Sequence, residues 1–298
     1  MHEAEEQLAA ALRAAPVEPE GGSRPVCSLA VAVVPETKRA PTIFSTEEIE
    51  SFHRHGFVRL KQAFPREAAL ALRDEIWTEI GEEHGVRRED RGTWKRLPRS
   101  PKGAKQSPLN AAVATQRFTG AISDLLGYDD WKRPATWGGF NVFFPEESTT
   151  KWDVPSDTWH WDGPPTGEGL LIFSFYGDVR PGGGGTLVGD GSPRLIQSYY
   201  DSLSPAHLAR PHKFHRKTFL RWKPWLQALT GQAKEPVVDR IEAFMERATE
   251  VHGVPCRVVE LTGEPGDAVF CNLGLMHAVA PNCSEQPRFM RVKFLFLD

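Results

Sequence analysis

The spacing of apolar residues differs between the two halves of this sequence. Before about residue 137, apolar positions recur every three or four residues, which is the period of one helix face. After that point, apolar runs are short and are separated by glycine and proline, which is typical of strands joined by turns. The pattern therefore predicts a helical first half and a β-rich second half.

Three helices and a short strand are predicted in the first half. The first helix begins at Ser45, because the motif Ser45-x-x-Glu48 has the form of a capping box, and it ends at Gly56. A strand over residues 57–60 follows. Pro65 opens the second helix, and a third helix covers residues 115–126. The second helix has its apolar face at Ala69, Leu72, Ile76 and Ile80.

Six strands are predicted in the second half, near residues 139–144, 169–179, 185–188, 257–261, 268–272 and 288–297. Strands and helices do not alternate regularly, which disfavours a Rossmann sheet. Many short strands after a helical half predict an α+β protein with a mainly β core. The expected architecture is a double-stranded β-helix (jelly roll, cupin-like) with the N-terminal helices packed on one sheet and a helical insertion over about 205–249.

The 298-residue chain is expected to divide near residue 42. Residues 1–42 are rich in proline, glycine and alanine, which predicts a flexible N-terminal extension with little core of its own. Residues 43–298 are expected to form a single domain that contains the insertion.

Composition and charge exclude several classes of function. With 36 basic and 39 acidic residues the net charge is −3, so no nucleic-acid partner is expected. No stretch approaches the roughly 20 apolar residues of a membrane span, and the N-terminus lacks the features of a secretory signal, so a cytoplasmic location is expected. The four cysteines show no C-x-x-C spacing, which argues against a zinc knuckle.

The sharpest chemical signal is the tripeptide His160-Trp161-Asp162. In an extended segment, residues i and i+2 point to the same face, so this imidazole and this carboxylate can reach one ion. A second imidazole would complete the facial triad of non-haem Fe(II) oxygenases, and His277 offers it. Arg288 follows at the start of the last predicted strand, where a guanidinium can hold a carboxylate in bidentate fashion.

In this order of residues the sequence resembles the phytanoyl-CoA dioxygenase-like family of Fe(II)/2-oxoglutarate-dependent oxygenases, over roughly residues 45–298. The helix and strand over 45–58 match the usual start of the family. His160, Asp162 and His277 match its three iron ligands, and Arg288 matches its 2-oxoglutarate anchor. The family's G-S-H turn is replaced by Gly191-Ser192-Pro193, in which proline stands where histidine is usual.

The resemblance implies a dioxygenase that uses Fe(II), 2-oxoglutarate and O2. Such an enzyme hydroxylates or otherwise oxidises a C–H bond of a small molecule and forms succinate and CO2. His160, Asp162 and His277 would be the catalytic metal ligands, and Thr186 would add a hydroxyl to the carboxylate held by Arg288. Since related halogenases have a small residue in place of the acid, Asp162 favours hydroxylation or another oxidation over halogenation.

Two residues near the expected cosubstrate site leave alternatives open. Asn141, a polar residue in an apolar strand, is either a cosubstrate contact or a core amide with all its hydrogen bonds satisfied. Arg291 competes with Arg288 as the anchor. Positions 288 and 291 differ in parity, so only one of them can point into the barrel, and the family spacing favours Arg288.

Two basic segments bear on the substrate. Residues 87–105 are rich in Lys and Arg, and no acid occurs between Asp201 and Glu235. These segments are either a solvated basic surface or a rim that attracts an anionic small-molecule substrate. Trp222 and Trp225 of the second segment either stack on the substrate or pack internally. The sequence leaves open a monomer or a homodimer.

Two other classes of function compete with the oxygenase. One is a jelly-roll ligand-binding protein without oxygenase activity, which would have no reason to keep three metal ligands and Arg288 together. The other is a zinc-dependent cupin-like enzyme, which has no need of a 2-oxoglutarate anchor. Arg288 is thus the residue that separates the three hypotheses.

Overall fold

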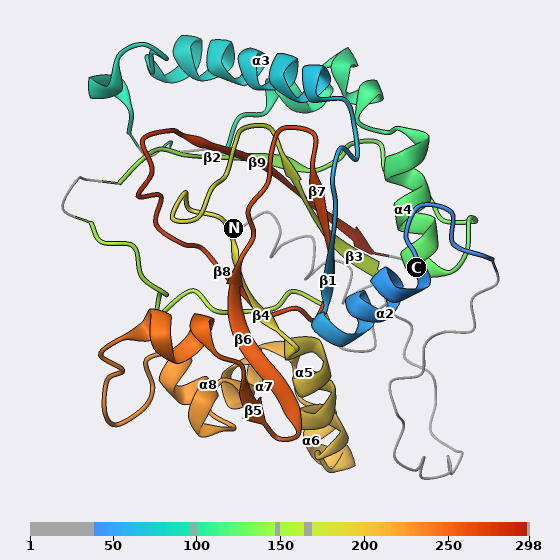
Figure 1. Ribbon diagram of the computed structural model, residues 1–298, viewed down its shortest axis with the longest axis vertical. Coiled ribbons are helices and arrows are strands. Elements are labelled where there is room, and N and C mark those ends of the chain that lie inside the picture. Colours follow the sequence, from blue (N-terminus) through green and yellow to red (C-terminus); the bar gives the residue numbers. More distant parts are fainter. Residues whose placement is uncertain (1–38, 96, 98–99, 147–149, 164–168, 297–298) are drawn as a thin grey trace. The chain divides into compact units, whose positions relative to one another are not determined.

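The computed structural model describes residues 39–95, 97, 100–146, 150–163 and 169–296, which all belong to one compact unit. Most of the predicted extension over 1–42, the turn at 164–165 and Leu297 lie outside these residues. Two antiparallel sheets form the centre, and helices cover the outer side of each sheet (Figure 1). No helix in these ranges has the length and apolarity of a membrane span.

The helices of the first half begin and end at local signals in the sequence. Helix α2 (Thr46–His55) is preceded by a complete capping box, in which Glu48 N donates to Ser45 Oγ over 3.2 Å and Ser45 N donates to the Glu48 carboxylate over 2.8 Å. It ends at Gly56, whose φ of 88° is left-handed. The first-half elements are α2, β1 (Phe57–Leu60), α3 (Arg66–His84), η1 (Arg91–Thr93), η2 (Gly103–Gln106), η3 (Pro108–Ala112) and α4 (Gln116–Leu126).

Ser45→Ala should lower the free energy of unfolding by about 1 kcal/mol, since the hydroxyl is the acceptor for an otherwise unpaired amide of the first turn. Thermal denaturation followed by circular dichroism would measure the loss. The matched control is Glu50→Ala, an exposed change in the same helix. Equal stability losses in the two variants would contradict a role for the cap.

The strands form two sheets whose order the sequence alone did not give. Sheet A has the order β1-β7-β3-β9-β2 and sheet B the order β5-β6-β4-β8. All six predicted strands are present, and β5 and β8 are additional. The strands after β1 are β2 (Gly139–Phe143), β3 (Gly169–Phe175), β4 (Leu187–Asp190), β5 (Thr249–Val251), β6 (Val254–Glu260), β7 (Ala268–Asn272), β8 (His277–Ala278) and β9 (Arg288–Phe296).

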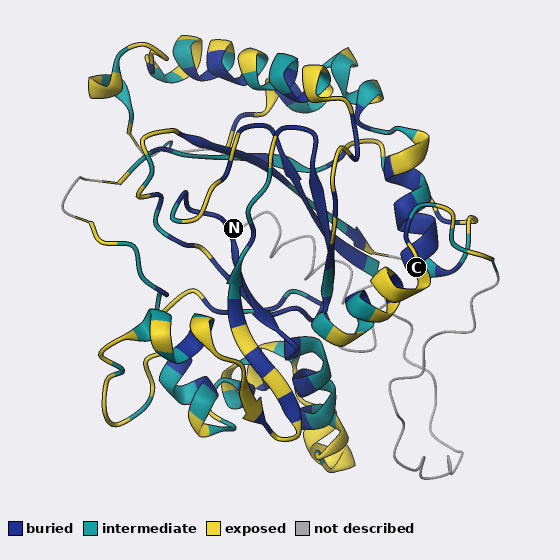
Figure 2. Ribbon diagram, in the orientation of Figure 1, coloured by how far each residue is buried: buried dark blue, intermediate teal, exposed yellow. Residues whose placement is uncertain are grey.

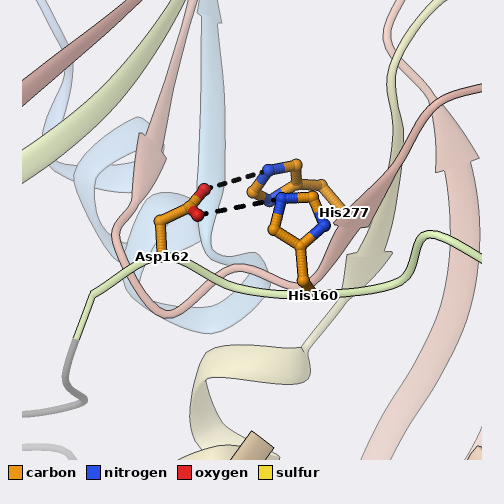
Figure 3. A group of neighbouring side chains, drawn as sticks. All are labelled: His160, Asp162 and His277. Atoms are coloured by element: carbon orange, nitrogen blue, oxygen red, sulfur yellow. Dashed lines mark ion pairs between the residues drawn. The ribbon is translucent and has the colours of Figure 1, made fainter. Parts of the chain in front are cut away.

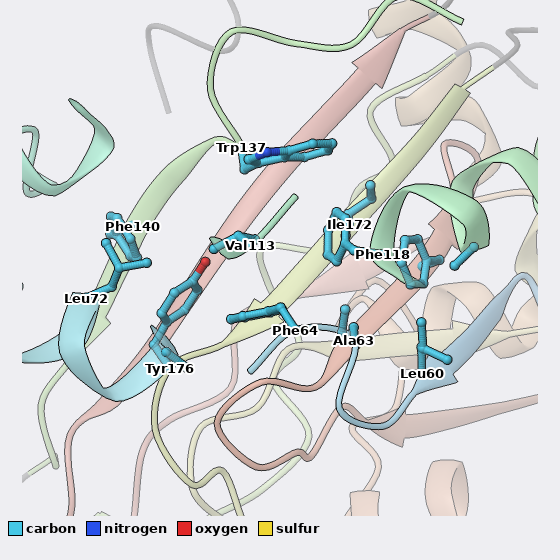
Figure 4. Close-up of a cluster of buried hydrophobic side chains, with 14 of the residues drawn as sticks. Leu60, Ala63, Phe64, Leu72, Val113, Phe118, Trp137, Phe140, Ile172 and Tyr176 are labelled. Atoms are coloured by element: carbon cyan, nitrogen blue, oxygen red, sulfur yellow. The ribbon is translucent and has the colours of Figure 1, made fainter. Parts of the chain in front are cut away.

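Three clusters of buried apolar side chains fill the spaces between the sheets and the helices. The first lies between sheet A and the helices α3 and α4, and includes Phe64, Phe118 and Tyr176 (Figure 4). Accordingly, α3 is buried on the side facing the sheet and exposed on the other (Figure 2). A second cluster, with Phe173 and Val188, fills the space between the two sheets. The third packs sheet B against the helices that follow β4.

Helices between β4 and β5 cover sheet B (Figure 1). The sequence pattern did not predict α5, which begins at Ser192, directly after the left-handed Gly191. Gly191-Ser192-Pro193 is thus a helix start and not only a turn, and Pro193 lies in the first turn, where its missing N–H costs nothing. The helices are α5 (Ser192–Asp201), α6 (Pro205–Leu208), α7 (His212–Phe219), α8 (Pro224–Leu229) and the π-helix η4 (Glu242–Glu246).

Candidate metal centre

Backbone pairing brings the two candidate histidines together. His160 lies in an extended segment before β3, and His277 begins β8. The two residues form an antiparallel bridge, in which His160 N donates to His277 O over 3.0 Å and His277 N donates to His160 O over 2.8 Å. Their ring centroids are 4.3 Å apart, and Asp162 points at both rings from the same side (Figure 3).

The three side chains offer one nitrogen or oxygen atom each, and these atoms all lie within 4.8 Å of one another. Asp162 Oδ1 is 3.7 Å from His160 Nε2, and Asp162 Oδ2 is 3.2 Å from His277 Nε2. Two imidazoles and one carboxylate at this spacing form the donor set of a 2-His-1-carboxylate centre.

Backbone carbonyls fix which ring nitrogens are free. His160 Nδ1 is 2.6 Å from Thr158 O, and His277 Nδ1 is 3.0 Å from Leu275 O. A carbonyl only accepts hydrogen bonds, so each Nδ1 carries the proton and each neutral ring keeps an unprotonated Nε2. Both Nε2 lone pairs then face the Asp162 carboxylate. Acceptors that face one another at this distance are stabilised by a cation between them, and Nδ1–H donation to a fixed acceptor is the usual support of a metal-bound histidine.

Burial and neighbouring charges change the pKa values of His160 and Asp162. Burial and the neighbouring His277 lower the pKa of His160 to about 4, so this ring is neutral at pH 7. Burial raises the pKa of Asp162, but the combined effects of His277, His160 and Arg216 are larger, so the pKa lies below its usual value. Asp162 Oδ2 is buried without a hydrogen-bond partner. An ionised carboxylate and the neutral His160 ring, with His277 Nε2 facing the same carboxylate, therefore fit a divalent cation.

Thr158 is a positioning residue that the sequence analysis missed. Its φ of 61° lies in the left-handed region, which is unfavourable for a β-branched residue. This conformation brings its carbonyl within hydrogen-bonding distance of His160 Nδ1. No propensity signal marks such a residue, because glycine and asparagine are the usual residues there.

The two arginines of β9 are both buried, on opposite faces of sheet A. Arg291 points toward the helix layer, where Nε donates to Gly138 O over 3.1 Å and Nη1 donates to Asn110 Oδ1. Arg288 pairs with Phe143 of β2 and points into the space between the sheets. The parity argument is confirmed: only Arg288 faces the interior of the barrel.

Arg288 retains unused donors inside the barrel. Its Nη1 donates to Gly184 O, and its guanidinium carbon lies 4.0 Å from the Phe143 ring centroid. Nε is buried without a hydrogen-bond partner. Burial, opposed by the charge of Glu260, lowers the pKa of Arg288 to about 10, so the side chain stays charged at pH 7. A buried cation with a free N–H group fits a carboxylate.

Asn141 and Thr186 also lie near the barrel interior. Asn141 pairs with Met290, two residues along β9 from Arg288 and on the same face. Its side chain makes no hydrogen bond within the described ranges, and the residue is half-buried. Thr186 is buried immediately before β4, and its parity is that of Val188, which packs between the sheets.

Part of the basic segment 87–105 is an ordinary charged surface. Three of its arginines form exposed ion pairs with acids, which is the solvated-surface alternative. These pairs are Arg87 with Asp90 at 2.5 Å, Arg88 with Asp74 at 2.9 Å and Arg91 with Glu285 at 3.6 Å. Lys105 is instead half-buried, and its side chain lies beside Gly139 of β2. Its Nζ is 3.5 Å from the position that a Cβ atom would take at this glycine.

The two tryptophans of the second basic segment pack internally. Trp222 contacts the rings of Tyr199 and Phe219 with centroids 5.5 and 6.1 Å apart, and Trp225 contacts Phe244 at 5.7 Å. All belong to the cluster between sheet B and its covering helices. Packing, and not stacking on a substrate, is therefore the role of Trp222 and Trp225.

Comparisons with known proteins support the fold. No protein-family profile matches the sequence, and no curated protein sequence matches it. Among solved structures, EctD from S. alaskensis with bound Fe matches with a TM-score of 0.51 and 17% identity, over 90% of this chain and 81% of EctD. The non-heme alpha-ketoglutarate-dependent carbocyclase SnoK from nogalamycin biosynthesis matches with a TM-score of 0.48 and 18% identity, over 87% of each chain. AviO1 from Streptomyces viridochromogenes matches with a TM-score of 0.49 and 16% identity, over 87% of this chain and 97% of AviO1. The likeness to EctD and the two facing sheets confirm the predicted jelly-roll fold with its covering helices.

Proposed function

We propose that this protein is an Fe(II)/2-oxoglutarate-dependent oxygenase that oxidises a C–H bond of a small molecule. The observation that carries the proposal is the arrangement of His160, Asp162 and His277. Both imidazoles are held by Nδ1 hydrogen bonds so that Nε2 faces the carboxylate, and the ligand atoms lie within 4.8 Å of one another. EctD, which has the same fold, was crystallised with Fe.

The residues in and around this centre would have different roles in such a reaction. Fe(II) with 2-oxoglutarate and O2 supplies the oxidising chemistry, and succinate and CO2 are the by-products. His160, Asp162 and His277 would hold the metal. Phe173, whose ring centroid is 6.2 Å from that of His277, and the other apolar residues between the sheets exclude water.

Arg288 is proposed to bind the distal carboxylate of 2-oxoglutarate, since it is the buried cation inside the barrel with an unpaired N–H group. Asn141 lies further along the same inner face, in the direction of Phe173 and the metal centre. This position supports the assignment of Asn141 as a hydrogen-bond donor to the cosubstrate. Thr186, which follows the glycine pair at 184–185, is assigned a hydroxyl contact to the same carboxylate.

Arg288 also favours the oxygenase over its competitors. A zinc-dependent cupin-like enzyme would use the same three ligands but has no need of a buried, charged arginine in the barrel. A ligand-binding jelly roll has no need of an ionised aspartate that faces two free imidazole nitrogens. The zinc enzyme accounts for the three ligands but not for Arg288, and the ligand-binding protein does not account for the three ligands. The oxygenase accounts for the ligands and for Arg288.

Succinate formation tests the proposal directly. Protein loaded anaerobically with Fe(II) is mixed with 2-oxoglutarate and air, and succinate is quantified by mass spectrometry. We expect slow, iron-dependent succinate formation without any substrate, and none when Zn(II) replaces Fe(II). A protein that binds Zn(II) and does not bind 2-oxoglutarate in calorimetry would support the zinc enzyme instead.

A further inference from the structure

Helix α7 packs directly behind the metal ligands. Trp161, which stands between the ligands His160 and Asp162, is fully buried. Its ring centroid lies 5.5 Å from that of His212 and 5.1 Å from that of Phe219, which are the first and last residues of α7. Positions 212, 216 and 219 have the i, i+4, i+7 spacing of one helix face. Arg216 therefore lies on the face of α7 that is turned to the metal centre.

Arg216 has no partner of its own. Its side chain is half-buried and makes no ion pair or hydrogen bond to any residue that the structure describes. The other cations of α7, Lys213 and Lys217, are exposed on a different stripe of the helix. The charge of Arg216 makes the smallest of the contributions to the lowered pKa values of His160 and Asp162, which agrees with its place on the face of α7 that is turned to Trp161.

Two observations indicate a ligand-binding role for Arg216. The chain around it contains no acid from residue 202 to residue 234, so no carboxylate lies close to Arg216 in the sequence. Asp162, the acid that does feel its charge, is committed to the metal. One turn earlier, His212 Nε2 is buried without a hydrogen-bond partner. A buried polar atom such as His212 Nε2 is costly unless a bound molecule satisfies it.

We propose that the substrate carries a carboxylate or a phosphate group and that Arg216 binds this group beside the metal centre. The inference rests on the proposed function, which it extends from the reaction to the class of substrate. A guanidinium holds either group through two parallel hydrogen bonds, which would fix the orientation of the substrate as well as its position. His212, one turn earlier on the same face of α7, would complete the hydrogen bonding of this group through its unpaired Nε2.

Matched pairs of small molecules test the charge requirement. Each carboxylic acid is compared with its primary amide, and each phosphate monoester is compared with its parent alcohol. The first comparison tests for a carboxylate site and the second for a phosphate site. Binding to Zn(II)-loaded protein saturated with 2-oxoglutarate is measured by ligand-observed NMR, because this complex does not turn over. We expect the anionic members to bind in preference to their neutral partners.

Variants of α7 then assign the binding to Arg216. Arg216→Gln should raise the Kd of the anionic ligands at least tenfold, whereas Arg216→Lys should retain part of the affinity. Lys213→Gln and Lys217→Gln remove the same charge from the exposed stripe and should leave the Kd unchanged. The proposal is overturned if the neutral partners bind equally well, if no anionic member binds, or if Arg216→Gln behaves like the lysine variants.

The cosubstrate affinity separates this inference from the proposed function. Calorimetry on the same Zn(II)-loaded samples gives the Kd of 2-oxoglutarate, which Arg216→Gln should not change. Normal 2-oxoglutarate binding with no effect of Arg216 on the anions would refute only the substrate class. If 2-oxoglutarate does not bind, the anion titrations are run without it, and Arg216-dependent binding would then refute only the oxygenase.

Discussion

His277→Ala should weaken Fe(II) or Co(II) binding by more than about 100-fold and abolish succinate formation. Loss of an outer hydrogen-bond partner of a metal ligand already costs roughly 10–100-fold in affinity, and loss of the ligand itself costs more. The effect is large because His277 is one of only two imidazoles in the described centre, and its Nε2 lies 3.2 Å from Asp162 Oδ2. Equilibrium dialysis against the metal measures the change.

The control for this variant is His207→Ala, which removes an exposed histidine from α6. It should leave the metal affinity unchanged. Asp162→Asn provides a second variant of nearly the same shape that removes the negative charge, and it should also weaken binding. Full metal affinity in both His277→Ala and Asp162→Asn would show that the metal is bound elsewhere, and the proposed centre would be wrong.

Arg288→Ala should weaken 2-oxoglutarate binding by roughly 30-fold to several thousandfold. Removal of one partner from a buried charge pair costs about 2–5 kcal/mol, because the other charge is left buried and unpaired, and 1.4 kcal/mol corresponds to a factor of ten. Metal binding should be nearly unaffected, since Arg288 is separated from the ligands along the inner face of β9. Calorimetric titration of the Zn(II)-loaded variant with 2-oxoglutarate measures the cosubstrate affinity, and equilibrium dialysis against the metal measures metal binding.

Arg291→Ala is the matched control, since it removes the same buried side chain from the other face of β9. Its hydrogen bonds to Gly138 and Asn110 connect sheet A to the helix layer. We therefore expect a lower melting temperature with an unchanged 2-oxoglutarate affinity in the folded protein. An unchanged affinity in Arg288→Ala together with a loss in Arg291→Ala would transfer the anchor to Arg291.

Much of the fold was predictable because its signals are local. The Ser45 capping box, Gly56 and the apolar stripe of α3 each lie within a few residues, and the structure confirms them. Helix α5 was missed because Gly191-Ser192-Pro193 was compared with a family turn, although proline in a first turn is also a helix signal. Strand β8 has only two residues, and its existence depends on pairing with β4, which no local pattern reveals.

The candidate ligands were predictable from residue type and spacing, but their surroundings were not. The choice between Arg288 and Arg291 could not be made from burial, because both faces of sheet A are covered and both side chains are buried. The interior face is identified by Met290, which has the same parity as Arg288 and packs in the cluster between the two sheets. The left-handed Thr158 and the approach of α7 to Trp161 are tertiary features, which have no counterpart in composition or periodicity.

The strand order of sheet A has a consequence for how the protein is made. In the described chain, each neighbouring pair in this sheet joins strands that are not consecutive: β1 with β7, β7 with β3, β3 with β9, and β9 with β2. During translation, β1, β2 and β3 therefore cannot pair in this sheet until β7 and β9 have been synthesised. Such long-range closure is slow, and the waiting segments are exposed to aggregation. A nascent chain that has not yet reached residue 288 has no partner for β2 and only one neighbour for β3, so chaperones have a long window in which to act.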